Sequence, residues 1–297
     1  MSEAHGASWL QLSLELGERD ADTLEAVLLE LGAMAVTLED NADQPILEPP
    51  PGATPLWHRT RVTGLFAGNA NPETLGEQLR RYLGETTLQL AHRRLADQDW
   101  IRVCLADLQP MRFGQRLWVC PTGHSPPVAD GVVVSLDPGL AFGTGTHPTT
   151  ALCLEWLDRM QPAGKTLIDY GCGSGILAIA ALRLAARRVW ATDIDPQALL
   201  ASRDNARKNR VGDRLEVLTD GQPLPRVDLL MANILAAPLM ALAPRFQSLV
   251  VPGGRVILAG LLSRQQEAVT AAFTPWFHVK PDAVRDDWVC LEAIRRD

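Results

Sequence analysis

The chain has 297 residues, enough for one large domain or two smaller ones, and its 46 % hydrophobic and 21 % charged residues are typical of globular proteins. No apolar run reaches the roughly eighteen residues of a membrane helix, and residues 1–5 lack the cationic start and apolar stretch of a secretory signal. We therefore expect a cytoplasmic protein that does not bind membranes. The net charge of −7 provides no cationic surplus for nucleic acid, so we expect no direct nucleic-acid binding.

Residues 1–97 are predicted to form a small α+β domain. Alternating leucines predict a half-buried strand over 9–16, and a helix follows with Asp22 as its N-cap and Gly32 at its end. The remaining pattern is, in chain order, a strand over 33–38, a loop over 40–57, a strand over 59–66, a helix between Asn71 and Gly84, and a strand over 88–95. Two such βαβ halves predict a ferredoxin-like domain. Nothing in it indicates catalysis, so we expect a role in recognition or scaffolding.

Residues 98–130 are predicted to be a partly structured linker, because prolines interrupt its short apolar runs. The five cysteines are at positions 104, 120, 153, 172 and 290. They show no C-x-x-C pair and no zinc-ligand spacing, which favours reduced, buried thiols over disulfides or a metal site. Cys120 before Pro121 leaves open the alternative of a nucleophilic cysteine, as in pyrimidine methylases.

From residue 131 the chain is predicted to alternate strands and helices, which is typical of an open, mostly parallel sheet. Strands are expected near 132–136, 166–170, 188–193, 215–219, 227–232 and 255–260, with a terminal pair near 277–294. Helices are expected near 148–160, 176–186, 196–209, 236–249 and 263–273.

The turn after the strand over 166–170 is the strongest signal for a ligand site, and residues 169–175 read DYGCGSG. Glycines permit positive φ and a close approach of backbone to ligand, and doubly wound sheets bind ligands at the carboxyl ends of their strands. The G-x-G-x-G spacing differs from the G-x-G-x-x-G of dinucleotide sites, and the Gly-Lys-Ser/Thr of a P-loop is missing. An acid followed by G-x-G-x-G resembles the S-adenosylmethionine motif of the seven-stranded, Rossmann-like methyltransferases.

Two further polar residues end neighbouring predicted strands. Asp193 can accept hydrogen bonds from both hydroxyls of a ribose, so we interpret it as a ligand residue rather than a structural acid. Asp195 before Pro196 is interpreted as a helix cap. Asn233 can donate or accept a hydrogen bond near a transferred methyl, although a loop asparagine can also bond its own backbone. The sequence Asn-Ile-Leu-Ala at 233–236, instead of Asn-Pro-Pro-Tyr, disfavours planar amines such as adenine N6.

Residues 136–150 are rich in glycine and threonine and lead into a predicted helix. Their hydroxyls and free amides can bind the carboxylate of a methionyl tail. Alternatively, the segment is a capping turn with Thr146 or His147 at the N-cap, and the residues alone favour neither interpretation. His147 is a possible base, but a lone histidine beside a proline is more often structural.

Four segments together resemble one family: DPGLAFGTGTHPTT at 137–150, DYGCGSGIL at 169–177, DIDP at 193–196 and NILA at 233–236. They are similar to the bacterial ribosomal protein methyltransferases, the protein methyltransferase A family of the class I S-adenosylmethionine-dependent superfamily. That family modifies large-subunit ribosomal protein eleven. The motif resemblance covers roughly residues 135–260, and the family's N-terminal ferredoxin-like substrate-recognition domain agrees with the predicted domain order.

The resemblance implies three parts: a ferredoxin-like recognition domain over 1–97, a linker over 98–130, and a Rossmann-like seven-stranded methyltransferase domain over 131–297. It implies transfer of methyl groups from S-adenosylmethionine to lysine ε-amines and the N-terminal α-amine of the ribosomal protein, free or on the ribosome. A basic substrate of this kind suits an acidic chain. The implied ligand residues, which decide the threonine loop in favour of binding, are Thr150, Gly171, Asp193 and Asn233, with Gly173 in the same cradle.

The chemistry requires no metal and no obligatory catalytic side chain. A lysine amine, with a pKa of about 10.4, loses its proton more easily when it is desolvated beside the sulfonium cation. Three other functions remain possible from the residues. These are an RNA or small-molecule methyltransferase, a nicotinamide dehydrogenase, which the glycine spacing disfavours, and a cofactor sensor without turnover.

Overall fold

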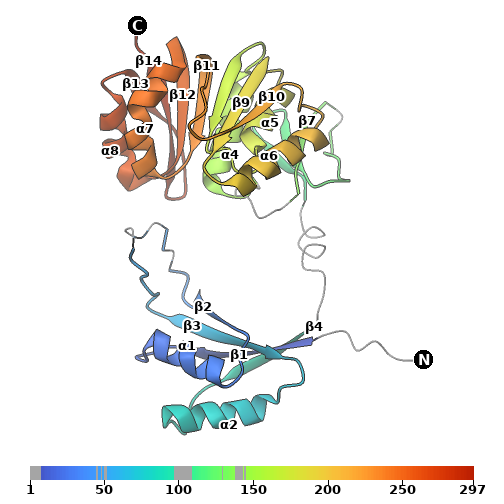
Figure 1. Cartoon of the computed structure of the whole chain (residues 1–297), viewed down its shortest axis with the longest axis vertical. Helices are drawn as coiled ribbons and strands as arrows, with labels where there is room; N and C mark the ends of the chain where they lie inside the picture. Colours follow the sequence, from blue (N-terminus) through green and yellow to red (C-terminus); the bar gives the residue numbers. More distant parts are fainter. Residues whose placement is uncertain are drawn as a thin grey trace, which may run out of the picture. The chain divides into compact units, whose positions relative to one another are not determined.

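The chain divides into two compact units, Met1–Asp99 and Trp100–Asp297 (Figure 1). The structure is a computed structural model that describes residues 8–44, 46–47, 49, 52–96, 109–128, 130–137, 143 and 145–297. In the part of the chain so described, no helix is long and apolar enough to cross a membrane. Cys104 and part of the predicted linker lie outside the described residues.

The first unit has the βαββαβ order of a ferredoxin-like domain, which confirms the prediction. Its elements are β1 (Ser8–Glu15), α1 (Ala21–Glu30), β2 (Ala35–Asp40), β3 (Thr60–Ala67), α2 (Pro72–Leu83) and β4 (Ala91–Ala96). The antiparallel sheet has the order β2-β3-β1-β4. The alternating leucines of β1 pack in one core cluster with Leu24 and Leu28 of α1 and Leu75 and Leu79 of α2. Both helices therefore cover the same face of the sheet, and none of the described residues forms a helix on the other face.

The predicted cap of the first helix is wrong by two residues. Asp20, not Asp22, is the N-cap, and its side chain accepts a hydrogen bond from the Thr23 amide at 2.8 Å. Asp22 lies in the first turn, where a negative charge is also favourable. The second helix begins and ends where the sequence predicts, with Asn71 as N-cap and Gly84 in the left-handed conformation at its end.

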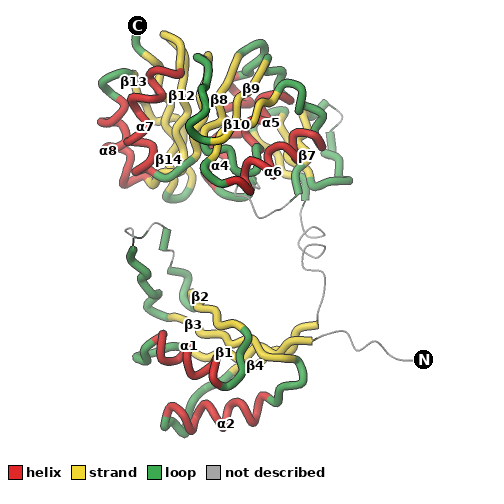
Figure 2. Tube along the Cα trace, in the orientation of Figure 1, coloured by secondary structure: helices red, strands yellow, loops and turns green. Residues whose placement is uncertain are grey.

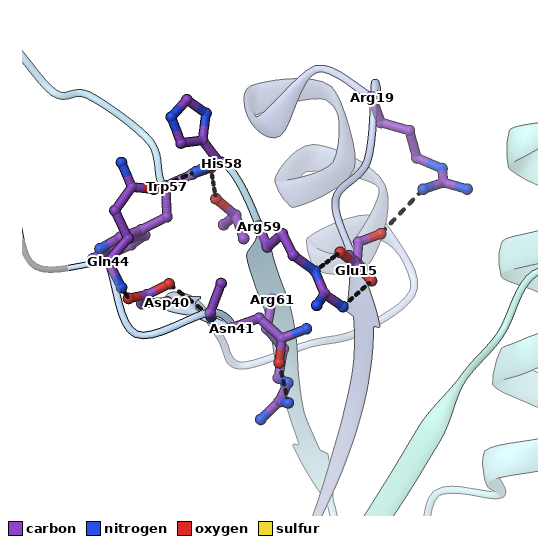
Figure 3. Close-up of polar contacts among 11 residues, drawn as sticks. Glu15, Arg19, Asp40, Asn41, Gln44, Trp57, His58, Arg59 and Arg61 are labelled. Atoms are coloured by element: carbon purple, nitrogen blue, oxygen red, sulfur yellow. Dashed lines mark hydrogen bonds and ion pairs between the residues drawn. The ribbon is translucent and has the colours of Figure 1, made fainter.

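Polar contacts fasten the base of the long loop between β2 and β3 (Figure 3). Arg59 donates to Glu15 at 2.8 Å, and Arg61 donates to Asn41. Across the loop, the side chain of Gln44 accepts a hydrogen bond from the His58 amide at 2.9 Å. These contacts join the loop to the ends of β1 and β3.

The second unit contains the long strand–helix alternation. Its elements are β5 (Met111–Phe113), β6 (Leu117–Cys120), β7 (Val132–Ser135), α4 (Pro148–Met160), β8 (Thr166–Tyr170), α5 (Ile176–Arg183), β9 (Arg188–Asp193), α6 (Pro196–Lys208), β10 (Leu215–Thr219), β11 (Val227–Asn233), α7 (Ala236–Leu249), β12 (Val250–Leu262), η1 (Ser263–Gln265), α8 (Gln266–Phe273), β13 (Phe277–Arg285) and β14 (Trp288–Arg295). The seven-stranded sheet has the order β10-β9-β8-β11-β12-β14-β13. Its first five strands are parallel and β14 is antiparallel to both neighbours, which confirms the predicted Rossmann-like methyltransferase fold.

Successive residues of the central strands pack on opposite faces of this sheet. Leu167 of β8 belongs to the core cluster that includes α4, α5 and α6, whereas Ile168 belongs to the cluster of α7 and α8. β8 is buried as far as Tyr170, and its two aliphatic residues, Leu167 and Ile168, pack on opposite faces of the sheet. Helices, red in Figure 2, flank the yellow strands of the sheet in this layered arrangement.

The described part of the predicted linker contains two short strands. β5 pairs with β6, and β6 pairs with β7, in a separate three-stranded sheet. The turn between β5 and β6 is held by Asp158 of α4, which accepts a hydrogen bond from the Gln115 amide at 2.6 Å. Residues 109–120 are therefore attached to the second unit. Cys120 is buried at the end of β6, and burial raises the pKa of its thiol, so its surroundings do not favour a nucleophile.

A buried carboxylate joins the terminal hairpin to the rest of the sheet. Glu292 of β14 accepts hydrogen bonds from Arg255 at 2.7 Å and Trp156 at 3.3 Å, and it forms an ion pair with Lys280 at 2.9 Å. Desolvation opposes ionisation of this carboxyl, but the hydrogen bonds from Lys280 and Arg255 prevail and lower its pKa.

We expect Glu292→Gln to lower the free energy of unfolding at pH 7 by about 1–3 kcal/mol, since both cations are partly exposed and remain hydrated. Because folding lowers the pKa of Glu292, its stabilisation is present above the ordinary value and is lost as pH falls through the folded value. The difference between wild type and variant should therefore shrink at acidic pH. Urea unfolding at neutral and acidic pH measures both effects. Glu267→Gln, at an exposed position of α8, is the matched control and should change stability by less than about 0.5 kcal/mol.

Candidate functional site

A cavity of about 710 Å³ lies at the carboxyl ends of the parallel strands β8, β9 and β11. β8 and β11 are neighbours at the point where the strand order reverses, which is where doubly wound sheets bind their ligands. The residues that line it are His147, Thr149, Tyr170, Gly171, Gly173, Thr192, Asp193, Ile194, Asp220, Asn233, Ile234, Leu235, Pro238, Ala241, Leu242, Gly260 and Trp288.

The glycine turn forms one side of the cavity. Gly171 has a φ of 78°, and a Cβ at this position would lie 2.3 Å from Cγ2 of Ile234. A side chain there would be both strained and blocked, so glycine is required for the backbone to pass this close to the cavity. The amide of Gly173 donates to the Asp193 carboxylate at 2.9 Å, which joins the turn to the end of β9.

Asp169, the acid that precedes the turn, lies beneath the cavity and does not line it. Its side chain is 1 % exposed, and its carboxylate accepts a hydrogen bond from the Ala178 amide at 2.9 Å near the start of α5. Burial raises the pKa of Asp169 to about 7, and the charge of Asp193 acts in the same direction. Asp169 therefore holds the glycine turn against α5, and a different carboxylate lines the cavity.

That second carboxylate is Asp193, at the end of β9. One oxygen accepts from the Gly173 amide, and the other accepts from the Asp195 amide at 3.0 Å. An ionised carboxylate has about four acceptor positions, so two remain for a ligand. Asp195 accepts from the Gln197 amide at 2.8 Å and caps α6, with Pro196 as its first residue, which confirms the predicted cap.

Asn233 ends β11 on the neighbouring side of the cavity. Its Nδ2 atom lies 3.4 Å from Oγ1 of Thr150, while its Oδ1 atom is buried and has no hydrogen-bond partner among the described residues. A buried amide oxygen without a partner is costly, and a ligand donor would remove that cost. Asn233 lines the cavity, so a ligand donor that reaches this buried oxygen would satisfy it.

Four of the five predicted ligand residues line the cavity: Gly171, Gly173, Asp193 and Asn233. Thr150 does not line the cavity, but its Oγ1 atom lies 3.4 Å from Nδ2 of Asn233, which does. Its neighbour Thr149 does line the cavity. The preceding loop at residues 138–142 and residue 144, which the sequence also implicates, lies outside the described residues.

Several lining residues were missed by the sequence reasoning. Asp220 directly follows β10, and the Tyr170 hydroxyl donates to it at 3.4 Å. Asp193 and Asn233 were predicted because each is a polar residue at the end of a strand. The same reasoning applied to the end of β10 would have predicted Asp220. Trp288 carries no such signal, because its place at this edge depends on the antiparallel pairing of Leu262 with Trp288. The α7 side of the cavity is apolar and is formed by Pro238, Ala241 and Leu242. Two exposed apolar residues, Ile194 and Leu235, also line it.

Known proteins resemble the chain over nearly its whole length. The profile of the family described as "Ribosomal protein L11 methyltransferase (PrmA)" matches residues 8–296. A relative from Marinobacter nauticus, named ribosomal protein L11 methyltransferase, is 50 % identical over 295 residues, which cover 97 % of this chain and 99 % of the relative. A relative of the same name from Pseudomonas putida KT2440 is 50 % identical over 290 residues, with the same coverage.

One solved structure is similar at the level of the fold and of the sequence. It is a crystal structure of a ribosomal protein L11 methylase from Lactobacillus delbrueckii subsp. bulgaricus, with a TM-score of 0.57 and 31 % identity. The alignment covers 64 % of this chain and 100 % of that one.

Proposed function

The chain belongs to the ribosomal protein L11 methyltransferase family, and we propose that it methylates the lysine ε-amines and the N-terminal α-amine of ribosomal protein L11. It is a methyltransferase that uses S-adenosylmethionine, and L11 is its substrate. Family membership resolves the alternatives of a dehydrogenase, a cofactor sensor and an RNA or small-molecule methyltransferase. A ribosomal protein as substrate supports the cytoplasmic location that the sequence predicts.

The cavity fits S-adenosylmethionine. Its volume of about 710 Å³ falls within the range of about 300–1,000 Å³ for small-molecule sites. We assign the ribose hydroxyls to Asp193, whose carboxylate has free acceptor positions, and the closest backbone approach to Gly171 and Gly173. The apolar wall of α7 and the exposed Ile194 side chain suit the adenine ring.

The proposal that an amine receives the methyl group rests on one observation: the buried Oδ1 atom of Asn233 has no hydrogen-bond partner among the described residues. A neutral amine offers an N–H to this oxygen and keeps its lone pair free to attack the methyl group. Bound S-adenosylmethionine supplies a methyl group that is already activated by its sulfonium sulfur. The protein's part is therefore to hold the amine in line and to exclude water, which can contribute about 7–11 kcal/mol in ideal cases.

No side chain at the cavity is needed as an obligatory base. The Nδ1 atom of His147 already accepts a hydrogen bond from the Thr149 amide, so it is occupied. Desolvation in an apolar site lowers the pKa of an amine, and the proton can leave to water before the amine docks.

The activity is tested by incubating the protein with S-adenosylmethionine and unmethylated L11 and measuring the intact mass of L11. We expect additions in steps of about 14 Da, mapped by peptide fragmentation to amines only. Free L11 and L11 within ribosomes are compared in parallel, because the sequence is compatible with either form. An unchanged L11 mass, in a sample that binds S-adenosylhomocysteine, would contradict the proposal. Methylation of side chains other than amines would contradict the role of Asn233.

We propose that the first unit recognises the protein substrate through the face of its sheet opposite α1 and α2. Direct cross-strand partners share a face, so the register places Glu15, Arg61 and Glu39 together on this side. The leucines of β1, by contrast, face the helices. The exposed carboxylate of Glu39 suits a basic partner.

This recognition is tested with Glu39→Lys, and Glu77→Lys on the exposed surface of α2 is the matched control. Glu39→Lys should raise KM for whole L11 several-fold, while KM for a short amine-containing peptide and affinity for the cofactor stay unchanged. The control should change none of the three. Equal effects of the two substitutions on L11 would rule out this face as the recognition surface.

A further inference from the structure

His147 is the N-cap of α4, the helix that begins at Pro148. Its Nδ1 atom accepts a hydrogen bond from the Thr149 amide at 3.3 Å, and the same atom lies 2.8 Å from the Thr149 hydroxyl. A ring nitrogen that accepts an amide N–H carries no proton of its own. When Nδ1 accepts from the Thr149 amide, as an N-cap does, the imidazole is neutral and its proton is on Nε2.

The capped end of α4 is part of the cofactor cavity. His147 and Thr149 both line it. The next residue, Thr150, is buried and contacts Asn233, so the same helical turn also supports the acceptor side of the site. On the opposite side the imidazole packs edge-on against the Trp288 indole, with ring centroids 4.9 Å apart and an interplanar angle of 69°. His147 thus contacts both Thr149 at the start of α4 and Trp288 of β14, and these two residues line the cavity.

Protonation of this ring would remove the cap. Imidazolium has two donors and no acceptor, so the Thr149 amide would lose its partner, while the Thr149 hydroxyl would accept from the protonated Nδ1. It would also place a positive charge at the positive end of the helix dipole and in a cavity that receives a sulfonium cation. The ring's aromatic neighbour on β14, Trp288, cannot titrate. The other ionisable residues that line the cavity are Tyr170, Asp193 and Asp220, and burial alone lowers the pKa of His147.

We propose that His147 is a positioning residue: its neutral ring holds the first turn of α4 in place, and its protonation releases Thr149 and Thr150 and weakens cofactor binding. This inference rests on the proposed function, because it takes the cavity as the S-adenosylmethionine site. It assigns His147 no role as a base. The residue acts on the reaction only through the helix end that it caps.

The test is the pH dependence of affinity for S-adenosylhomocysteine, which binds without reacting and so leaves the titration of the amine substrate out of the measurement. Calorimetry between pH 5 and pH 8 compares wild type, His147→Asn and His147→Ala. Wild-type affinity should be highest at pH 8. It should fall by up to about tenfold per pH unit once pH drops below the His147 pKa, which is lower than the ordinary value of about 6.5.

The two variants separate capping from titration. Asparagine is a strong N-cap that does not protonate, so His147→Asn should restore most of the affinity at pH 8 and lack the acidic fall. Alanine provides no cap, and His147→Ala should bind about three- to thirtyfold more weakly at every pH, the loss that follows from an absent N-cap. Asp169, with a pKa of about 7, titrates in the same range but is present in all three proteins, so the difference between them isolates His147.

Thermal unfolding at each pH identifies any loss of affinity that comes from unfolding. If His147→Asn shows the same acidic fall as wild type, the proposal is wrong. A thousandfold loss of kcat in His147→Asn with cofactor binding intact would also overturn it and would indicate a general base. Failure of the wild type to bind at pH 8 would instead contradict the proposed function.

Discussion

Asp193→Ala is expected to weaken binding of S-adenosylmethionine by about 10²–10⁴-fold. Each hydrogen bond from a ribose hydroxyl to a carboxylate contributes about 1.5–3 kcal/mol, and about 1.4 kcal/mol corresponds to a factor of ten. Alanine removes both acceptors, and it also removes the oxygen that accepts from the Gly173 amide at 2.9 Å. The glycine turn would then lose its link to β9 together with the ribose contacts.

Calorimetry with S-adenosylmethionine or S-adenosylhomocysteine measures the effect directly. Asp195→Ala is the matched control, because Asp195 is an exposed acid two residues away that caps α6 and does not line the cavity. It should cost about 0.5–2 kcal/mol of stability but leave cofactor affinity within a few-fold of wild type. At saturating cofactor, Asp193→Ala should recover much of its kcat. Unchanged affinity in Asp193→Ala would refute the ribose assignment.

Asn233→Ala is expected to reduce kcat by about 10²–10³-fold, the cost of removing one preorganised hydrogen-bonding group from a reacting centre. The buried Oδ1 atom has no partner among the residues that the structure describes, so its loss leaves no broken contact there. The Nδ2 contact with Thr150, at 3.4 Å, is at the long limit of a hydrogen bond and should contribute little to stability. Cofactor affinity should therefore fall much less than kcat.

Asn233→Asp separates positioning of the amine from its protonation state. A carboxylate keeps the acceptor oxygen but stabilises the protonated amine, which cannot attack. We expect low activity at neutral pH and a partial recovery as pH rises, whereas Asn233→Ala should not recover. Single-turnover rates with L11 from pH 7 to pH 10 measure both profiles. Parallel profiles for the two variants would count against a direct contact between Asn233 and the amine.

Local sequence patterns predicted most elements of the second unit, because their signals act over a few residues. The strand β8, the glycine turn and the Asp195-Pro196 cap are all determined by neighbours in the chain, and each lies where it was expected. The N-cap of α1 was predicted wrongly because signals over a few residues could not choose between two nearby acids. Both Asp20 and Asp22 are good caps locally, and the choice depends on where the leucines of α1 meet the sheet.

The site was partly predictable for a different physical reason. Parallel strands end at one edge of a sheet, so residues such as Asp193 and Asn233 converge once the strands are identified. That rule does not tell which of two adjacent threonines faces the ligand. Both threonines are buried, but Thr149 lines the cavity whereas Thr150 contacts Asn233, and this difference arises from the packing of α4 on the sheet.

The sequence by itself determined the ferredoxin-like and Rossmann-like folds, the glycine turn and the family, because these depend on periodicity and on motifs with fixed spacing. Only the tertiary structure decided that Trp288 forms a wall of the cavity, that the Asn233 oxygen is buried without a partner among the described residues, and that the His147 ring packs against Trp288. The first depends on the antiparallel pairing of β12 with β14, the second on the burial of the end of β11, and the third on the packing of α4 against β14. Each depends on contacts between residues that are far apart in the chain, which local patterns cannot encode.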